Sequence, residues 1–238
     1  MAPAFEGDLL GKSSAAPAYS VTYASRLVKI SPWRAKRWLA GYQYRYSVRS
    51  GSEKREGRQP PVVHRKRDLG RTYASFIEVI DLLFVREFLE QGVSLQKLRR
   101  ALNEAEERLD KSHFAHEVFF TNGKEIFLRL QQTDIILLLS GGQWAMPPVI
   151  EQLAHRIDFD ETTKIARRWH PLGKDIPIVI DPLVSFGRPA IEGKGIATAN
   201  VFDLFKAEGE NLQAASSWLG VSDFEAEAAI GFERQLAA

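Results

Sequence analysis

Residues 19–41 of this 238-residue chain have the sequence YSVTYASRLVKISPWRAKRWLAG, which contains two short helical patterns separated by a tight turn. Ser20 or Thr22 can cap a first helix that continues to about residue 28. Ser31 followed by Pro32 is a strong start signal for a second helix, because a serine oxygen accepts from the free N–H groups of the first turn and proline suits the first helical position. The stretch therefore predicts a helix, a turn and a helix.

The second of these helices has two different faces. Ala35, Trp38 and Leu39 share one face by the i, i+3, i+4 rule, and Gly41 supplies the stop. The turn before the helix falls at residues 29 and 30. The side chains expected on its outward side and flanks are Trp33, Arg34, Lys36 and Arg37.

Basic charge is concentrated in the same part of the chain. Residues 21–67 hold thirteen Lys and Arg and two acidic residues, a net charge of +11 in a chain whose total is +2, so the remainder carries −9. A basic block confined to one end is the electrostatic signature of a surface that meets phosphates. Nucleic-acid binding is therefore the leading hypothesis.

A two-stranded hairpin is predicted directly after the second helix. Tyr42, Tyr44 and Tyr46 alternate as in a strand, residues 50–52 form the turn, and residues 60–63 form the return strand, which must lie at an edge because it contains prolines. The basic residues expected at its tip are Arg49, Lys54, Arg55 and Arg58, and Arg45 lies on the outgoing strand. This is the outline of a wing.

Two longer helices are expected next. From residue 72 apolar side chains recur with the 3.6-residue helical period until Gly92, and Ser94 then caps a second helix that continues to Leu109. The short link between them implies that the two helices pack as antiparallel neighbours.

The middle of the chain, residues 112–174, is predicted to be an α+β segment. Residues 117–120 and 125–130 flank an Asn-Gly pair at Asn122, which is the strongest short-range hairpin signal. Residues 135–139 and 164–169 are expected to be strands, and residues 147–155 a helix.

The last part of the chain, residues 175–238, is predicted to begin with short extended pieces and to end in three helices. Thr198 is expected to cap the first helix, Asn211 the second, and Ser222 with Glu225 the third as a capping box. The unit is expected to pack around Leu212, Trp218, Leu219, Phe224 and Ile230.

A helix-turn-helix outline also occurs in these last helices, at residues 219–222. Charge argues against a nucleic-acid role for it. Residues 182–238 hold four basic and eight acidic residues, a net of −4 that would repel a phosphate backbone. The C-terminal unit is therefore predicted to contact a protein partner or a second copy.

Bulk composition sets few further limits. The chain is 45% hydrophobic and 26% charged, which is ordinary for a globular protein, and it has no cysteine, which excludes disulfides and thiolate sites and fits a cytoplasmic location. The first 18 residues lack a signal-peptide pattern and are expected to be a flexible tail. No apolar run approaches the roughly 18 residues that a membrane span requires.

These observations predict a mainly α fold with an α+β middle. The expected parts are the tail (1–18), a winged helix-turn-helix with a helical extension (19–111), the middle segment (112–174) and a C-terminal three-helix unit (175–238).

The first hundred residues resemble the winged helix-turn-helix head of MerR-type regulators. The features that carry the resemblance are the two helices of residues 19–41, the basic wing, and the Gly92-Val93-Ser94-Leu95 step. Lys29 stands at a turn position that often holds glycine, and Lys36-Arg37-Trp38 replaces an arginine followed by two aromatic residues. The resemblance implies DNA binding and leaves the base preference open.

Residues 177–238 are similar to the small C-terminal domain of VapB-type antitoxins. The signature is Gly187-Arg188-Pro189 with Ile191 and Gly193, followed by three helices. A basic helix-turn-helix followed by that domain is the layout of long mycobacterial-type VapB antitoxins. The resemblance implies a VapC-type ribonuclease as partner, with Arg188 as a candidate contact to its acidic site, because a guanidinium pairs with carboxylates through two hydrogen bonds.

Catalytic and metal motifs receive little support. His113 and His116 with Glu117 could ligate a metal, and Asp158, Asp160 and Glu161 could hold Mg²⁺, but in each case a structural role is favoured over a site. The glycine pair at Gly141 lacks the Lys-Ser or Lys-Thr of a phosphate loop. No cofactor, metal or catalytic residue is predicted.

The sequence thus predicts a cytoplasmic antitoxin that binds operator DNA as a homodimer and a VapC-type toxin through its C-terminal half. The predicted DNA contacts are Ser31, Trp33, Arg34, Lys36, Arg37, Arg45, Arg49, Lys54, Arg55 and Arg58. A MerR-like regulator that senses a small molecule through its middle segment is the alternative. A metal-dependent enzyme is a third, which would require His113, His116 and Asp158 to converge.

Overall fold

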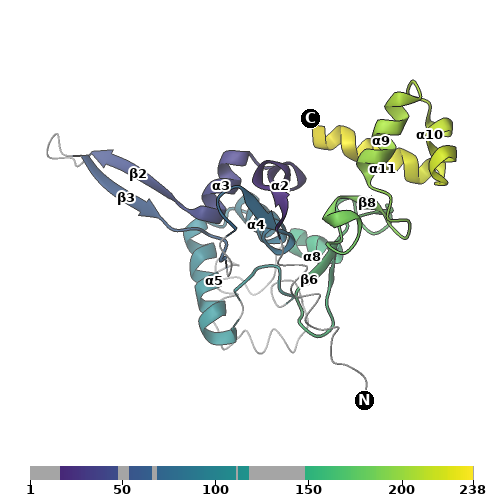
Figure 1. Cartoon of the computed structure of the whole chain (residues 1–238). Helices are drawn as coiled ribbons and strands as arrows, with labels where there is room; N and C mark the ends of the chain where they lie inside the picture. The colour runs from purple at the N-terminus through teal and green to yellow at the C-terminus, as the bar shows by residue number, and fades with distance from the viewer. Residues whose placement is uncertain (1–16, 48–53, 66–68, 111, 118–147, 238) are drawn as a thin grey trace, which may run out of the picture.

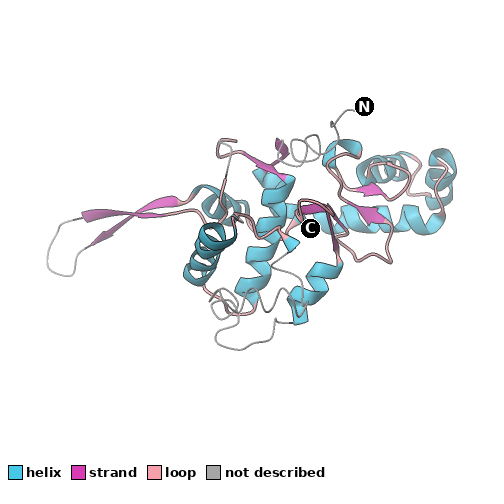
Figure 2. Cartoon of the chain, turned by 90° about the horizontal axis from the view of Figure 1, so that it is seen from below, coloured by secondary structure: helices cyan, strands magenta, loops and turns pink. Residues whose placement is uncertain are grey.

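A computed structural model describes residues 17–47, 54–65, 69–110, 112–117 and 148–237. These residues form a mixture of helices and small antiparallel sheets, each described sheet having two strands. The hairpin of strands β2 (Tyr42–Ser47) and β3 (Lys54–Gln59) projects from one end of the molecule (Figures 1 and 2). The opposite end is formed by helices α9 (Thr198–Ala207), α10 (Leu212–Leu219) and α11 (Asp223–Ala237). No helix among these residues is long and apolar enough to cross a membrane.

The two helices predicted from residues 19–41 are confirmed. Helix α2 spans Val21–Leu27, with the Ser20 side chain accepting from the Tyr23 N–H, and helix α3 spans Pro32–Ala40, with the Ser31 side chain accepting from the Arg34 N–H. Lys29, in the turn between them, has φ of 53°, in the left-handed region that favours glycine. The turn thus has the backbone conformation for which glycine is better suited than lysine.

The helix that follows the hairpin begins later than expected. Strand β1 (Pro17–Ser20) pairs antiparallel with strand β4 (Tyr73–Ser75), and helix α4 (Phe76–Glu90) starts only after it. Ser75 and Glu78 form a reciprocal capping box at that start. The first strand also begins at residue 17, inside the stretch expected to be a flexible tail. Helix α5 spans Leu95–Leu109, as predicted.

The hairpin corrects the predicted return strand. Strand β2 (Tyr42–Ser47) pairs with strand β3 (Lys54–Gln59), so the return strand is the charged segment and not residues 60–63. Val62 and Val63 are fully buried and donate their backbone N–H groups to the carbonyl of Trp38. The prediction was wrong because both faces of the hairpin are largely exposed, so its return strand lacks the apolar alternation that marks a half-buried strand.

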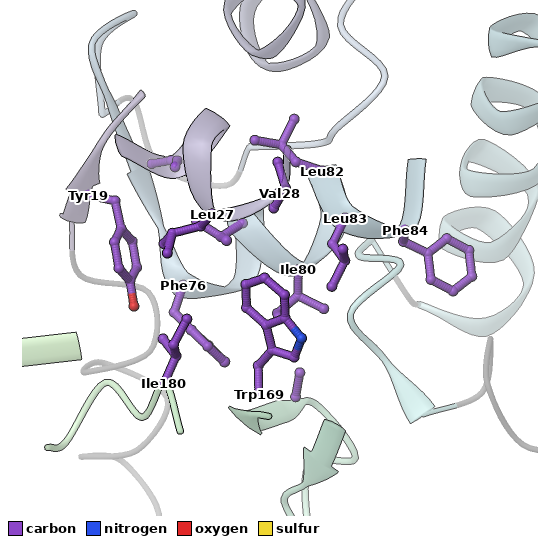
Figure 3. Packing of buried hydrophobic residues seen from close by; sticks show 14 of the residues in the cluster. Tyr19, Leu27, Val28, Phe76, Ile80, Leu82, Leu83, Phe84, Trp169 and Ile180 are labelled. Carbon is purple, nitrogen blue, oxygen red and sulfur yellow. The ribbon is translucent and has the colours of Figure 1, made fainter. Parts of the chain in front are cut away.

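Helix α4 lies at the centre of the main hydrophobic core. Ile80 of α4 lies near Trp169 and Phe76 of α4 lies near Ile180, two residues that come from much later in the chain (Figure 3). Phe84 stacks on Phe114 with ring centroids 5.0 Å apart. The core therefore joins the N-terminal elements to the later half of the chain.

The middle segment is described only in part. Helix α8 (Pro148–His155) and strand β6 (Ala166–Trp169) form where a helix and a strand were predicted, and β6 pairs antiparallel with strand β5 (Ile157–Phe159). The predicted hairpin at Asn122 and the strand at residues 135–139 lie outside the described residues.

The C-terminal elements follow the predicted order. Strands β7 (Ile178–Val179) and β8 (Ala190–Ile191) pair antiparallel, with a short 3₁₀ turn, η2 (Ser185–Gly187), between them. Three helices follow and pack on one another, namely α9 (Thr198–Ala207), α10 (Leu212–Leu219) and α11 (Asp223–Ala237).

The predicted caps of these three helices are only partly confirmed. Asn211 caps α10, and the Ser222–Glu225 capping box begins α11. Thr198 does not cap α9, because it is the first helical residue. Its buried hydroxyl instead lies within hydrogen-bond distance of the Glu233 carboxylate and the carbonyl of Pro189.

Two aromatic residues expected inside the C-terminal unit lie on its surface. Trp218 is 74% exposed and Phe224 is 54% exposed. The buried faces of α10 and α11 instead include the small side chains of Ala215, Ser216 and Ala226. Helices that meet through small residues leave little room for a large ring between them.

Candidate nucleic-acid interface

The outward side of α3 carries the predicted contact residues. Trp33 is 63% exposed, and the side chains of Arg34 and Lys36 are also exposed. Within the described part of the chain, neither Arg34 nor Lys36 makes an ion pair. Ser31 caps the helix through its side-chain oxygen, so its hydroxyl hydrogen remains available to donate to a phosphate.

Arg37 occupies a different position from its neighbours. The central carbon of its guanidinium lies 4.0 Å from the ring centroid of Trp33 and 3.0 Å from that of Tyr42. This cation–π contact joins helix α3 to the first residue of strand β2. Arg37 therefore bridges α3 and the start of the hairpin.

The register of the hairpin separates its side chains into two faces. Tyr42, Tyr44 and Tyr46 alternate along β2, and their partners on β3 are Gln59, Gly57 and Arg55. We call these six residues the tyrosine face. The other face consists of Gln43, Arg45 and Ser47 with Arg58, Glu56 and Lys54.

The contact between Arg37 and Tyr42 places the tyrosine face on the outward side of α3. Arg55 shares this face, whereas Arg45, Lys54 and Arg58 project from the opposite one. The Arg45 guanidinium also pairs with Glu56, with Nε 2.9 Å from Oε1, although both side chains are largely exposed. The structure thus brings together only part of the predicted basic set, and Arg49 lies outside the described residues.

Some charge of the basic block is used inside the fold. Arg65 donates to Glu78 at 2.7 Å and to the backbone carbonyls of Gly70 and Tyr73. Its side chain is only 12% exposed. Arg65 therefore holds the loop before β4 against α4, and the count of thirteen basic residues overstates the charge of the interface.

Sequence reasoning missed the tyrosine face as a functional candidate. The three tyrosines served only as a strand signal, but Tyr44 is 40% exposed and Tyr46 is 46% exposed. The tyrosines occupy alternate positions in the sequence, which indicates that all three lie on one face of a strand. The sequence does not indicate that this face lies next to Trp33.

The predicted metal candidates have structural roles. Nδ1 of His113 lies 2.7 Å from Oδ2 of Asp81, which is fully buried and also accepts from the Ala115 N–H. Burial raises the pKa of Asp81, and the charge and hydrogen bond of His113 oppose that rise. The described residues contain no group of three His, Asp or Glu that could hold a metal ion.

The second candidate set is also part of local structure. Asp158 accepts from Lys174 at 2.5 Å and contacts Nε2 of His170 at 2.9 Å. Asp160 accepts from the N–H groups of Thr162 and Thr163, as in a turn. His113, His116 and Asp158 form no shared site among the described residues.

Arg188 lies at the other end of the molecule in an unusual loop. Its side chain is exposed, and its Nε donates weakly to the carbonyl of Ser185 at 3.4 Å. Ser185 and Phe186 both have positive φ, 47° and 57°, and Phe186 is 86% exposed. Consecutive left-handed non-glycine residues are strained, and such strain concentrates at functional sites.

Four large apolar side chains of the C-terminal unit are exposed. Lys194 links the loop after β8 to the turn between α10 and α11, since its Nζ donates to the Gly220 carbonyl at 2.6 Å and lies 3.5 Å from a Glu225 oxygen. We call the exposed residues of this unit the apolar patch: Leu183, Phe186, Trp218 and Phe224.

A hollow of about 100 Å³ that opens to solvent lies between α2, α4, α8, β6 and α11. Apolar side chains, including Trp169 and Phe232, form part of its lining. Four basic residues also line it, against one acidic residue, Glu87. The basic residues are Arg26, Lys29, Arg86 and Arg156.

Comparison with known proteins finds similarity to a curated sequence and to a solved structure. The chain is 22% identical over 218 residues to "Putative antitoxin VapB45" of Mycobacterium tuberculosis (strain ATCC 25618 / H37Rv), a match that covers 87% of this chain and 89% of that protein. The X-ray crystal structure of Rv2018 from Mycobacterium tuberculosis has the same fold, with a TM-score of 0.66 at 20% identity over 90% of this chain and 98% of that chain. No protein-family model matches the chain.

Proposed function

We propose that this protein is the antitoxin of a type II toxin–antitoxin pair, and that it is a regulator and not an enzyme. The observation that carries this proposal is the similarity to a protein named as an antitoxin, which extends over 87% of the chain. An antitoxin requires a toxin that it neutralises. The finer proposal is that this toxin is a VapC-type ribonuclease and that the antitoxin also represses its own operon in the cytoplasm.

DNA binding is assigned to α3 and the hairpin, in a winged helix-turn-helix arrangement. Exposed Arg34 and Lys36 on α3 and Arg55 on the tyrosine face supply positive charge on one side of the molecule. Each phosphate contact in B-DNA contributes about 0.9 to the slope of log affinity against log salt. Three contacts per protomer thus give a salt dependence that is easily measured.

A homodimer is the proposed DNA-binding form. One α3 helix covers a single half-site, and two-fold operators are matched by two-fold proteins. The expected operator is a pseudo-palindrome whose half-sites lie about one helical turn apart.

Toxin binding is assigned to the C-terminal end. Residues 182–238 have a net charge of −4, which disfavours nucleic acid, and the apolar patch there supplies surface of the kind that protein partners bury. Arg188 adjoins Phe186 of this patch through the strained loop. We propose that Arg188 pairs with acidic residues of the toxin while the aromatic side chains supply the buried area.

Co-expression with the protein of the neighbouring gene tests the proposal directly. We expect a stable complex on size-exclusion chromatography, and we expect the antitoxin to abolish RNA cleavage by the purified neighbour. A neighbour that is no nuclease, or that elutes apart from this chain, would contradict the toxin assignment. Arg34→Glu/Arg37→Glu should abolish operator binding and leave the toxin complex intact.

Sensing of a small molecule is the second candidate function. The hollow lined by Arg26, Lys29, Arg86 and Arg156 favours an anionic compound, but its walls come from several segments and not from the middle segment alone. Saturable thermal stabilisation by a small carboxylate or phosphate, lost in Arg156→Ala, would support this candidate. If no compound of these classes shifts the melting temperature, it is excluded.

A further inference from the structure

We propose that the tyrosine face is a binding site for single-stranded nucleic acid, in which unpaired bases stack on Tyr44 and Tyr46. This site goes beyond operator binding, because its ligand is a strand with unstacked bases and not a duplex. The inference does not depend on the toxin partner. It rests on the spacing, exposure and charge of the hairpin.

The spacing of the rings matches bases that have been pulled apart. The ring centroids of Tyr42 and Tyr44 are 6.0 Å apart, and those of Tyr44 and Tyr46 are 5.8 Å apart. Neighbouring bases of a duplex strand are separated by about 3.4 Å, roughly half of that distance. Successive tyrosines therefore fit bases of an extended strand, whereas stacked duplex bases cannot match them one to one.

The absence of a side chain at Gly57 lets the Tyr44 ring lie against the opposite strand. A Cβ atom built on Gly57 would lie 2.5 Å from Cζ of the Tyr44 ring and 2.8 Å from Cε1, so the ring lies across the bare backbone of the opposite strand. One side of the ring is thus covered by the hairpin. The ring remains 40% exposed, which leaves its other side to a base.

The row of aromatic side chains continues beyond the hairpin. Tyr42 contacts the Arg37 guanidinium, which in turn contacts Trp33, and Trp33 is 63% exposed. Rings and one cation therefore form a continuous row from α3 to the middle of β2. Sequence-tolerant single-strand binders combine such stacking platforms with arginine contacts.

Basic side chains border the row where a sugar–phosphate backbone would lie. Arg55 is the cross-strand partner of Tyr46, and Arg34 and Lys36 lie on α3 beside Trp33. No third strand pairs with the hairpin in the described part of the chain. Cross-strand aromatic pairing, which stabilises many hairpins, does not explain this row, because the three rings lie on one strand and face Gln59, Gly57 and Arg55.

The test measures binding of the full-length protein to a labelled 15-nucleotide oligothymidylate by fluorescence anisotropy, with a mixed-sequence duplex of equal length in parallel. Stacking contributes a factor of about 5 to 150 per base. Tyr44→Ala/Tyr46→Ala should therefore weaken oligothymidylate binding at least tenfold, and by a clearly larger factor than it weakens duplex binding. Tyr44→Phe/Tyr46→Phe, which keeps both rings, should bind as the wild type does.

Tyr73→Ala is the matched control, because Tyr73 is also exposed, at 52%, but lies on β4 and not on the hairpin. It should leave both affinities unchanged. A wild-type protein that fails to bind oligothymidylate, or equal losses for strand and duplex, would overturn the proposal. Equal losses would assign the tyrosines to the operator interface, and absence of strand binding would leave the antitoxin proposal untouched.

Photocrosslinking provides a second measurement. It uses the wild-type protein, so its result does not depend on whether a variant folds. An oligonucleotide that contains 5-iododeoxyuridine should crosslink to the peptide that holds residues 42–47. Crosslinks confined to other parts of the chain would refute the assignment.

Discussion

The guanidinium of Arg37 lies between two aromatic rings, 4.0 Å from the centroid of Trp33 and 3.0 Å from that of Tyr42. Trp33 lies on α3 and Tyr42 begins β2, so this side chain bridges the helix and the hairpin. Its contact with Tyr42 puts the tyrosine face on the same side as the exposed residues of α3.

Replacement of Arg37 should affect stability as well as binding. Arg37→Ala should lower the free energy of unfolding by about 1 kcal/mol, because it removes a partly buried cation–π contact. Arg34→Ala, on the exposed flank of the same helix, should change it by less than about 0.5 kcal/mol. Urea unfolding of both variants measures the difference, and equal values would show that Arg37 is merely another surface charge.

Arginines on the two faces of the hairpin should contribute differently to the salt dependence of duplex binding. Arg55→Ala should reduce the slope of log duplex affinity against log salt by about 0.9 per protomer, because one phosphate contact is lost. Arg45→Ala should leave the slope unchanged, because Arg45 lies on the opposite face and pairs with Glu56. The reverse result would place the other face of the hairpin on the DNA.

Gly41 should tolerate no side chain. Its φ is 66°, and a Cβ there would collide with the carbonyl oxygen of Gln59. Gly41→Ala should therefore cost about 2 kcal/mol or more in the free energy of unfolding. Gly92→Ala is the control, since its φ is also positive at 82° but its Cβ would meet open space. Thermal unfolding should rank Gly41→Ala as the more damaging; the opposite order would mean that the contact with Gln59 is unimportant.

The apolar patch should matter for toxin binding and not for folding. Trp218→Ala and Phe224→Ala remove exposed rings, so each should shift the melting temperature by little while weakening the toxin complex by 1 kcal/mol or more. Ile230→Ala, in the buried face of α11, should instead destabilise the protein by about 2 to 5 kcal/mol. Calorimetric titration with toxin separates the two effects, and unchanged affinity in both surface variants would exclude the patch.

Asp158 should make stability depend on acid pH. Partial burial raises the pKa of this carboxyl, but hydrogen bonds from Lys174 and His170 outweigh that effect and hold the pKa below its ordinary value. Its contribution is therefore present above a pH of about 4 and is lost as the pH falls through the lowered pKa.

Asp158→Asn should reduce stability at pH 7 by roughly 1 kcal/mol, because the ion pair with Lys174 is lost and a neutral amide accepts hydrogen bonds more weakly than a partly exposed carboxylate. The difference from the wild type should shrink below about pH 4. Urea unfolding between pH 3 and 7 checks this, and a difference that stays constant with pH would rule out the assigned cause.

Local features of this protein were predictable from sequence because they are made by residues close together in the chain. Ser31 caps α3 through Arg34, and Ser222 with Glu225 caps α11, each over a distance of three residues. Apolar periodicity likewise gave the buried face of α3 and the extent of α5. The prediction of the hairpin's return strand was wrong, because a strand that is exposed on both faces has no apolar pattern to detect.

The sequence by itself determined the caps, the main helices and the opposite charges of the two ends. Only the tertiary structure decided which basic residues share a surface. In the folded protein Arg65 forms an ion pair with Glu78, and Arg45 lies on the face of the hairpin opposite to the tyrosine face. Trp218 lies on the surface, although it was expected in the core. The reason is physical: periodicity defines two faces of an element, but contacts between distant elements, such as Arg37 on Tyr42, select the face that each one buries or presents.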